Sequence, residues 1–107
     1  MPIIRIDFDD GMVSGDSVLA ASQALRKIVS EETGIDDVPV YANAAHVKVH
    51  IAPVEVFVEM SASKIDDIET LFKKIKDRIC SWRDQSGFQY RINLTLIPMN
   101  WKFETGI

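Results

Sequence analysis

The chain has 107 residues, of which 47% are hydrophobic and only 5 are Gly and 4 are Pro, a composition typical of one folded domain, expected over residues 1–107. The formal net charge of −4 at pH 7 argues against nucleic acid or an anionic membrane as the main partner, because both attract basic patches. No apolar run reaches the roughly 18 residues of a membrane span and no leader precedes the first strand, so we expect a cytoplasmic protein.

The chain begins Met1-Pro2, and the residues that follow alternate as in a short strand over 2–8. If Met1 is removed, Pro2 carries a secondary amine in place of an amide. An α-amino group has a reference pKa of about 7.7–8.0, and an apolar pocket lowers this pKa because burial disfavours the charged form. Pro2 is therefore a candidate general base. The strand points Ile4, Ile6 and Phe8 to one face and Ile3, Arg5 and Asp7 to the other.

A turn at residues 9–11 and a helix over 15–33 are predicted next. Ser14 or Asp16 can cap the start of this helix, and Gly34 is a natural end signal. Apolar residues recur inside it at helical spacing: Val18, Ala21, Leu25, Ile28 and Val29.

The segment from residue 36 to 60 is rich in residues that favour strands. Residues 38–42 predict a strand start, and Pro39 suits an edge strand. A further strand is predicted over 54–60. Because the turn at Ala52-Pro53 is tight, the alternating residues 46–51 either fold back on 54–60 as a hairpin or form a short extra strand that pairs elsewhere.

A second helix is predicted to begin at Ser63, which with Asp66 forms a capping-box variant, and to run to about residue 83. Its only cysteine, Cys80, is expected to be an unreactive buried or half-buried thiol. A last strand follows, with Tyr90, Ile92, Leu94 and Leu96 on one face and Gln89, Arg91, Asn93 and Thr95 on the other.

Two strands led by proline, over 2–8 and 53–60, are each followed by an amphipathic helix and another strand. The chain therefore reads as two tandem β-α-β units, and right-handed crossovers place both helices on the same side of one sheet. We predict an α+β fold with one mixed four-stranded sheet and two helices on one face.

The other face of this sheet carries charges of both signs. It is either the solvated face of a monomer or a contact surface in which opposite charges pair between subunits and apolar groups are buried. The second interpretation accounts better for the apolar tail at Trp101 and Phe103. The residues predicted on this face are Arg5, Asp7, Glu55, Phe57, Glu59, Arg91, Asn93 and Thr95.

The Met-Pro start and the two β-α-β units resemble the tautomerase superfamily over nearly the whole chain. Within it, the nearest resemblance is to carboxymethyl-hydroxymuconate isomerase, and a little-characterised branch with a Pro-x-Val-Glu-Val strand is about equally similar. The blocks that carry the resemblance are Thr33-Gly34-Ile35, Lys48-Val49-His50, Phe57-Val58-Glu59-Met60 and Pro98-Met99-Asn100-Trp101-Lys102.

The resemblance implies a homotrimer with its sheets turned inward and an isomerase or tautomerase that moves a proton in a small oxo- or hydroxy-carboxylic acid. Pro2 is then the catalytic base, and no metal or organic cofactor takes part. Lys48 stands where the resemblance places an arginine, and His50 matches a histidine. Trp101 and Phe103 are candidates for the apolar wall of the substrate site.

The chain departs from the pattern in two ways: Lys48 lacks the two-pronged grip of an arginine, and the segment between the middle strands is shorter. We interpret His46 and His50 as solvated strand positions rather than metal ligands, because Lys48 between them repels a cation. Two hypotheses follow. A proline-dependent isomerase is preferred, and a non-enzymatic trimeric module with the same fold is favoured if Met1 is retained.

Overall fold

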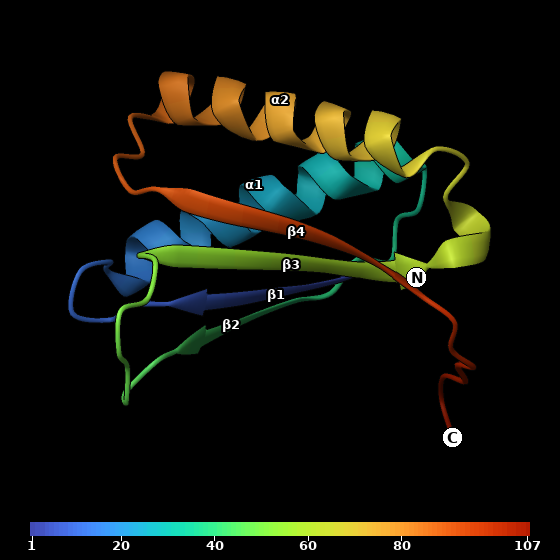
Figure 1. The fold of residues 1–107 in the computed structure, drawn as a ribbon, viewed down its shortest axis with the longest axis horizontal. Helices are drawn as coiled ribbons and strands as arrows, with labels where there is room; N and C mark the ends of the chain where they lie inside the picture. The colour runs from blue at the N-terminus through green and yellow to red at the C-terminus, as the bar shows by residue number, and fades with distance from the viewer.

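The computed structural model describes residues 1–107 and contains four strands and two α-helices. The strands lie in the order β2-β1-β3-β4, with β1 parallel to β2, β3 parallel to β4, and the central pair β1 and β3 antiparallel. Each parallel pair is joined through a helix, so the predicted α+β fold of two tandem β-α-β units is confirmed (Figure 1). The elements are β1 (Ile3–Phe8), α1 (Gly15–Thr33), β2 (Val40–Ala44), β3 (Val54–Ser61), the 3-10 turn η1 (Ala62–Lys64), α2 (Ile68–Ser86) and β4 (Ile92–Met99).

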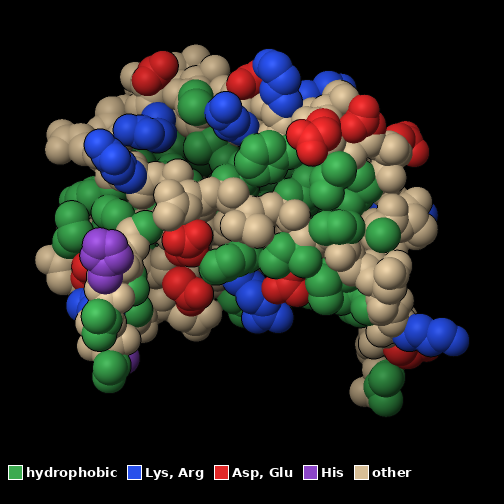
Figure 2. All heavy atoms as spheres, in the orientation of Figure 1, with side chains coloured by type: hydrophobic (Ala, Val, Ile, Leu, Met, Phe, Trp, Pro, Cys, Tyr) green, Lys and Arg blue, Asp and Glu red, His purple; other side chains and the backbone are tan.

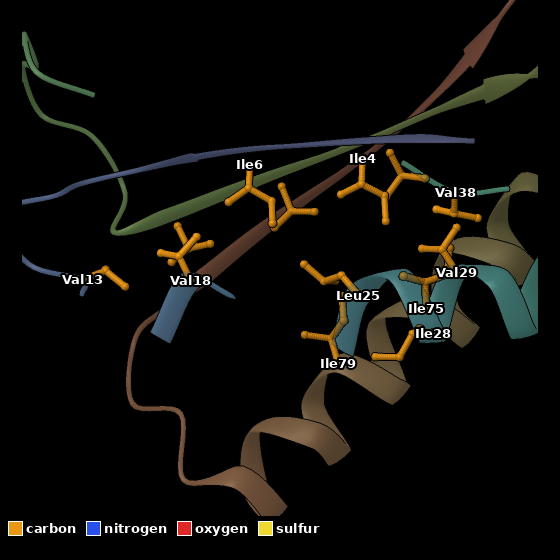
Figure 3. Close-up of a cluster of buried hydrophobic side chains, with 13 residues drawn as sticks. Ile4, Ile6, Val13, Val18, Leu25, Ile28, Val29, Val38, Ile75 and Ile79 are labelled. Carbon is orange, nitrogen blue, oxygen red and sulfur yellow. The ribbon is translucent and has the colours of Figure 1, made fainter. Parts of the chain in front are cut away.

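Both helices cover the same face of the sheet (Figure 1), as predicted, and the core lies between the two layers. The alternation of β1 and β3 sends Ile6 and Val56 to this face, where both are 0% exposed. Leu25 of α1 and Ile79 of α2 point toward them (Figure 3). The exposed β2 lies at one edge, where the sequence placed the strand that follows Pro39. Neither helix combines the length and apolar character that a membrane crossing requires.

The ends of α1 follow their sequence signals. Ser14 caps the start by accepting a hydrogen bond from the Ser17 backbone N–H at 3.2 Å. Gly34 ends the helix in the left-handed region with φ 71°, where a side chain would be strained.

The predicted bounds of α2 are wrong at both ends. The helix begins at Ile68 because Asp67, not Ser63, accepts the free backbone N–H groups of Glu69 and Thr70. Residues 62–64 form only the short turn η1. The helix also continues beyond its predicted end at about residue 83, through residues 84–86, and Gly87 caps it with φ 74°.

The strand predicted over residues 46–51 is absent, either as a hairpin with 54–60 or as an extra strand. Both edges of β3 are already paired, one with β1 and the other with β4, so no edge remains for a hairpin. The irregular segment 45–53 between β2 and β3, here called the arm, instead projects from the sheet on the side away from the helices (Figure 1). Val47 is 95% exposed, and His50 has a positive φ of 54° that is incompatible with a strand.

Candidate functional site

Pro2 lies buried, with less than 2% of its surface exposed, directly before β1. The strand that follows Pro2 is held in place by the Ile4 backbone N–H, which donates to the Pro39 carbonyl at 3.0 Å. The strand register places Ile3 opposite Glu59, so Pro2 lies at the end of the sheet where β3 finishes. With Met1 in place its nitrogen is an amide, which has no lone pair available for proton transfer.

The tail that carries Trp101 and Phe103 starts at the same end of the sheet, because β4 is parallel to β3 and Met99 lies opposite Ser61. Trp101 is half-buried, whereas Phe103 is 51% exposed. The structure therefore brings the predicted apolar wall to the end of the sheet that holds Pro2, and it leaves Phe103 uncovered within one chain.

Lys48 and His50 lie at the opposite end of the sheet, on the arm. This end is fixed by the pairing of Phe8 with Ala44 and by the Asp9 N–H, which donates to the Pro53 carbonyl at 3.0 Å. The six residues of β1 separate the two ends, and at about 3.3 Å per residue they span roughly 20 Å. One chain therefore does not bring Pro2 together with Lys48 or His50.

Lys48 is held by two carboxylates. Its Nζ lies 2.7 Å from Asp9 Oδ1 and also pairs with Asp10 Oδ1, while Asp10 Oδ2 lies 3.2 Å from His46 Nδ1. The hydrogen bonds that Lys48 donates to Asp10 and Asp9 raise the pKa of Lys48, and the Lys48 ammonium lowers the pKa of both carboxyl groups. Lys48 thus stays cationic, but a substrate carboxylate has to compete with two resident ones. The sequence had indicated Asp9 and Asp10 only as a turn signal.

The sheet face away from the helices is hollowed between the arm and the tail, and acidic and basic side chains crowd its floor (Figure 2). Arg5 Nε lies 2.7 Å from Glu59 Oε1, and the Arg5 guanidinium lies 5.9 Å from the ring centre of Tyr41. Asp7 lies directly opposite Glu55 in the strand register without a basic partner. The register places on this face the strand residues that were predicted there, among them Arg5, Phe57 and Thr95. Like charges directly opposite each other, such as Asp7 and Glu55, weaken a sheet that is left uncovered.

A hollow of about 770 Å³ lies where this face meets the arm. Among the predicted site residues only His50 lines it, together with the acids Asp7 and Glu55 and the cation Arg91. Asn93 also lines it and donates from Nδ2 to Glu55 Oε2 at 3.1 Å. Arg91 makes no salt bridge, so it is the cation of this hollow that remains free to pair with an anion. No group of three His, Cys, Asp or Glu side chains is arranged to hold a metal ion.

The fold is similar to several solved structures. A domain of unknown function from Sebaldella termitidis superposes with a TM-score of 0.67 at 15% identity, covering 100% of this chain and 98% of that one. 5-Carboxymethyl-2-hydroxymuconate delta-isomerase gives 0.65 at 12% identity, covering 100% and 88%. A fused 4-OT protein solved as an asymmetric trimer gives 0.60 at 12% identity, covering 91% and 85%. No family model matches the sequence, and no curated protein matches it.

These similarities extend over nearly the whole chain, and they include the isomerase that the sequence blocks resemble. At identities of 12–15% they establish the arrangement of strands and helices and leave the chemistry open. The sequence resemblance is therefore confirmed at the level of the fold: the chain has the fold of the tautomerase superfamily.

Proposed function

We propose that this protein is a cofactor-independent isomerase or tautomerase in which the Pro2 amine, freed by removal of Met1, moves a proton in a small oxo- or hydroxy-carboxylic acid. The observation that carries the proposal is the burial of Pro2 at the head of β1, with less than 2% of its surface exposed, in a chain with the tautomerase fold. Burial disfavours the ammonium form and so lowers the pKa of the amine. A base with a pKa near working pH is the most effective in proton transfer.

A homotrimer is part of the proposal, because one chain leaves the predicted site incomplete. Pro2 lies at one end of the sheet and Lys48 and His50 at the other, so contact between them requires a second subunit. The open face supplies the reason to associate: its unpaired groups Asp7 and Arg91 have opposite charge and can pair between copies. The similar fused 4-OT structure is a trimer, which supports this assembly.

The substrate contacts in the proposal are those that the resemblance implies. Lys48 and His50 hold the carboxylate, and Trp101 and Phe103 form an apolar wall beside the Pro2 amine. Lys48→Ala and Arg91→Ala test which cation acts. If Lys48 is the anchor, Lys48→Ala raises the KM for a small carboxylate and Arg91→Ala leaves it unchanged. The reverse pattern would assign the carboxylate to Arg91.

The chemistry is tested by ketonisation of a simple enol such as phenylenolpyruvate. Protein without Met1 is compared with protein that keeps one residue before Pro2, since this single difference converts the amine into an amide. The processed form is expected to catalyse ketonisation with a rate that rises with pH through the pKa of the amine. The blocked form is expected to be inactive with an unchanged circular dichroism spectrum. Equal rates in the two forms would exclude Pro2 as the base.

A second candidate function is a non-enzymatic trimeric module that uses this fold for interaction. The pairing of Lys48 with Asp9 and Asp10 favours it, because the charge of the predicted substrate cation is already paired within the chain. Two results together would establish this second candidate over the first. Intact mass would show that native protein retains Met1, and processed protein would not catalyse ketonisation.

A further inference from the structure

Arg5 lies on the open face of the sheet, three positions after Pro2 in the same chain. Because β1 and β3 are antiparallel, the start of β1 lies beside the end of β3 (Figure 1). Glu59, the salt-bridge partner of Arg5, lies opposite Ile3, the residue that follows Pro2. The Arg5 side chain therefore lies diagonally across the sheet, and its guanidinium is closer to Pro2 than its own Cα position suggests.

Two side chains hold this guanidinium and leave its two terminal nitrogens free. Arg5 Nε donates to Glu59 Oε1 at 2.7 Å on the β3 side, and the guanidinium carbon lies 5.9 Å from the ring centre of Tyr41 on the β2 side. Nη1 and Nη2 donate to no group of the chain, and the Arg5 side chain is 51% exposed. Arg5 therefore presents two parallel N–H donors in a fixed orientation, which is the geometry that binds a carboxylate through two hydrogen bonds.

The other cations considered for the site do not offer this geometry beside Pro2. Lys48 is a point charge and already contacts two aspartates. Arg91 is unpaired, but it precedes β4 at the opposite end of the sheet, where Ile92 lies opposite Val54. Arg5 thus provides the two-pronged contact that Lys48 lacks, and it belongs to the same chain as Pro2.

The separation of the two groups limits the substrate. The Arg5 guanidinium and the Pro2 nitrogen are two to three strand residues apart, roughly 7–10 Å. Hydrogen bonds from the guanidinium to a carboxylate take up about 3 Å of this distance, and proton transfer to the amine takes up about 3 Å more. The remaining few ångströms place the reacting carbon about two bonds from the carboxylate carbon.

We propose that Arg5 is a substrate-binding residue whose Nη1 and Nη2 bind the carboxylate beside the Pro2 amine, so that the site takes acids in which the reacting carbon lies about two bonds from the carboxylate carbon. The inference rests on the proposed function and adds to it a contact from the chain that bears Pro2. Glu59 and Tyr41 position the guanidinium. Lys48 of a second subunit then contributes charge, and Arg5 contributes the directional contact.

Arg5→Lys tests the two-pronged contact, because it keeps the charge and removes the parallel donors. The probe is (E)-cinnamate, an unreactive carboxylate with the carbon skeleton of phenylenolpyruvate, and cinnamamide is its uncharged control. Dissociation constants are measured by calorimetry on full-length protein freed of Met1. Arg5→Lys is expected to weaken cinnamate binding about tenfold and to leave cinnamamide binding unchanged. Arg26→Lys, the same change at an exposed position of α1, is expected to bind cinnamate as wild type does.

Steady-state kinetics and light scattering complete the test. Arg5→Lys is expected to raise the KM for phenylenolpyruvate about tenfold and to keep the wild-type mass. Equal cinnamate affinity in Arg5→Lys and Arg26→Lys, an equal loss for cinnamate and cinnamamide, or no cinnamate binding by wild type would overturn the proposal. A smaller mass for Arg5→Lys would also overturn it, because Arg5 would then be a subunit contact. Failure of the proposed function gives a different result: processed wild type does not ketonise the enol, while its cinnamate binding still depends on Arg5.

Discussion

The assignment of the two sheet faces can be tested by substituting adjacent residues of β1. Ile6 is 0% exposed against the helices, whereas Asp7 is exposed on the other face opposite Glu55. Replacement of a buried isoleucine by alanine loses transfer free energy and leaves a cavity, so Ile6→Ala is expected to lower the free energy of unfolding by about 2–5 kcal/mol. For a domain of this size each 1 kcal/mol corresponds to a fall in Tm of about 4–8 °C.

Asp7→Ala is the matched control. It removes one member of a like-charge pair and leaves no cavity, so within a single chain its effect is expected to lie within about 0.5 kcal/mol of wild type and can be slightly stabilising; loss of the proposed pairing with Arg91 between copies adds to this only in the assembled protein. Both variants are measured by urea denaturation followed by circular dichroism, at one fixed chain concentration because association adds a concentration-dependent contribution. An equal loss in the two variants, or a loss below about 1 kcal/mol for Ile6→Ala, would show that the faces are wrongly assigned.

Three further predictions concern α2, the arm and the open face. Gly87→Ala places a side chain at φ 74° and is expected to destabilise by about 1–2 kcal/mol, measured as a lower Tm; an unchanged Tm would contradict the left-handed cap. The aspartates that bind Lys48 have lowered carboxyl pKa values and Lys48 a raised one, so this pairing stabilises the arm above the unfolded carboxyl pKa and is lost as pH falls through the folded values. Amide protection of Ala45 and Asp9, whose N–H groups donate to the Phe8 and Pro53 carbonyls at the base of the arm, should therefore decrease on acidification in wild type and already be lower at pH 7 in Lys48→Met; equal protection in both proteins would show that Lys48 does not hold the arm. Light scattering should give roughly three times the 12.1 kDa chain mass for wild type, and Phe57→Glu on the open face should reduce it without loss of helix content, whereas a wild-type monomer would refute assembly.

The fold was predictable because local patterns and global topology agree. Strict alternation in β1 and β3, the helical spacing of Leu25 and Val29 in α1, and the αL cap at Gly34 each indicate one structure only. Two proline-led repeats of strand and helix, each with a right-handed crossover, then predict one mixed sheet with both helices on the same face, but they do not predict the order of its strands. The start of α2 was predicted at the wrong residue because Ser63 and Asp67 both carry oxygens that can cap a helix. Which of them caps it depends on the backbone conformation between residues 62 and 67.

The arm and the site were less predictable, because they depend on contacts between distant segments. Val47 and Val49 alternate with polar residues as in a strand, but strand formation also requires a free neighbouring edge. The partners of Lys48 lie 38 or more positions away in the chain, and no local signal connects them. Pro2 and Lys48 lie at opposite ends of the sheet because of the directions in which the strands run. Residue patterns alone do not determine these directions.

The central claim is that Pro2 acts as a base through a buried free amine, and a titration of this nitrogen tests it most directly. Protein labelled with 15N-proline and freed of Met1 allows the Pro2 amine to be followed by NMR as a function of pH. We expect a single titration with a pKa below the reference of about 7.7–8.0 for an α-amino group, because Pro2 is buried and burial disfavours the charged form. A pKa at or above that reference, or an amide resonance that does not titrate on protein isolated in its native form, would contradict the account.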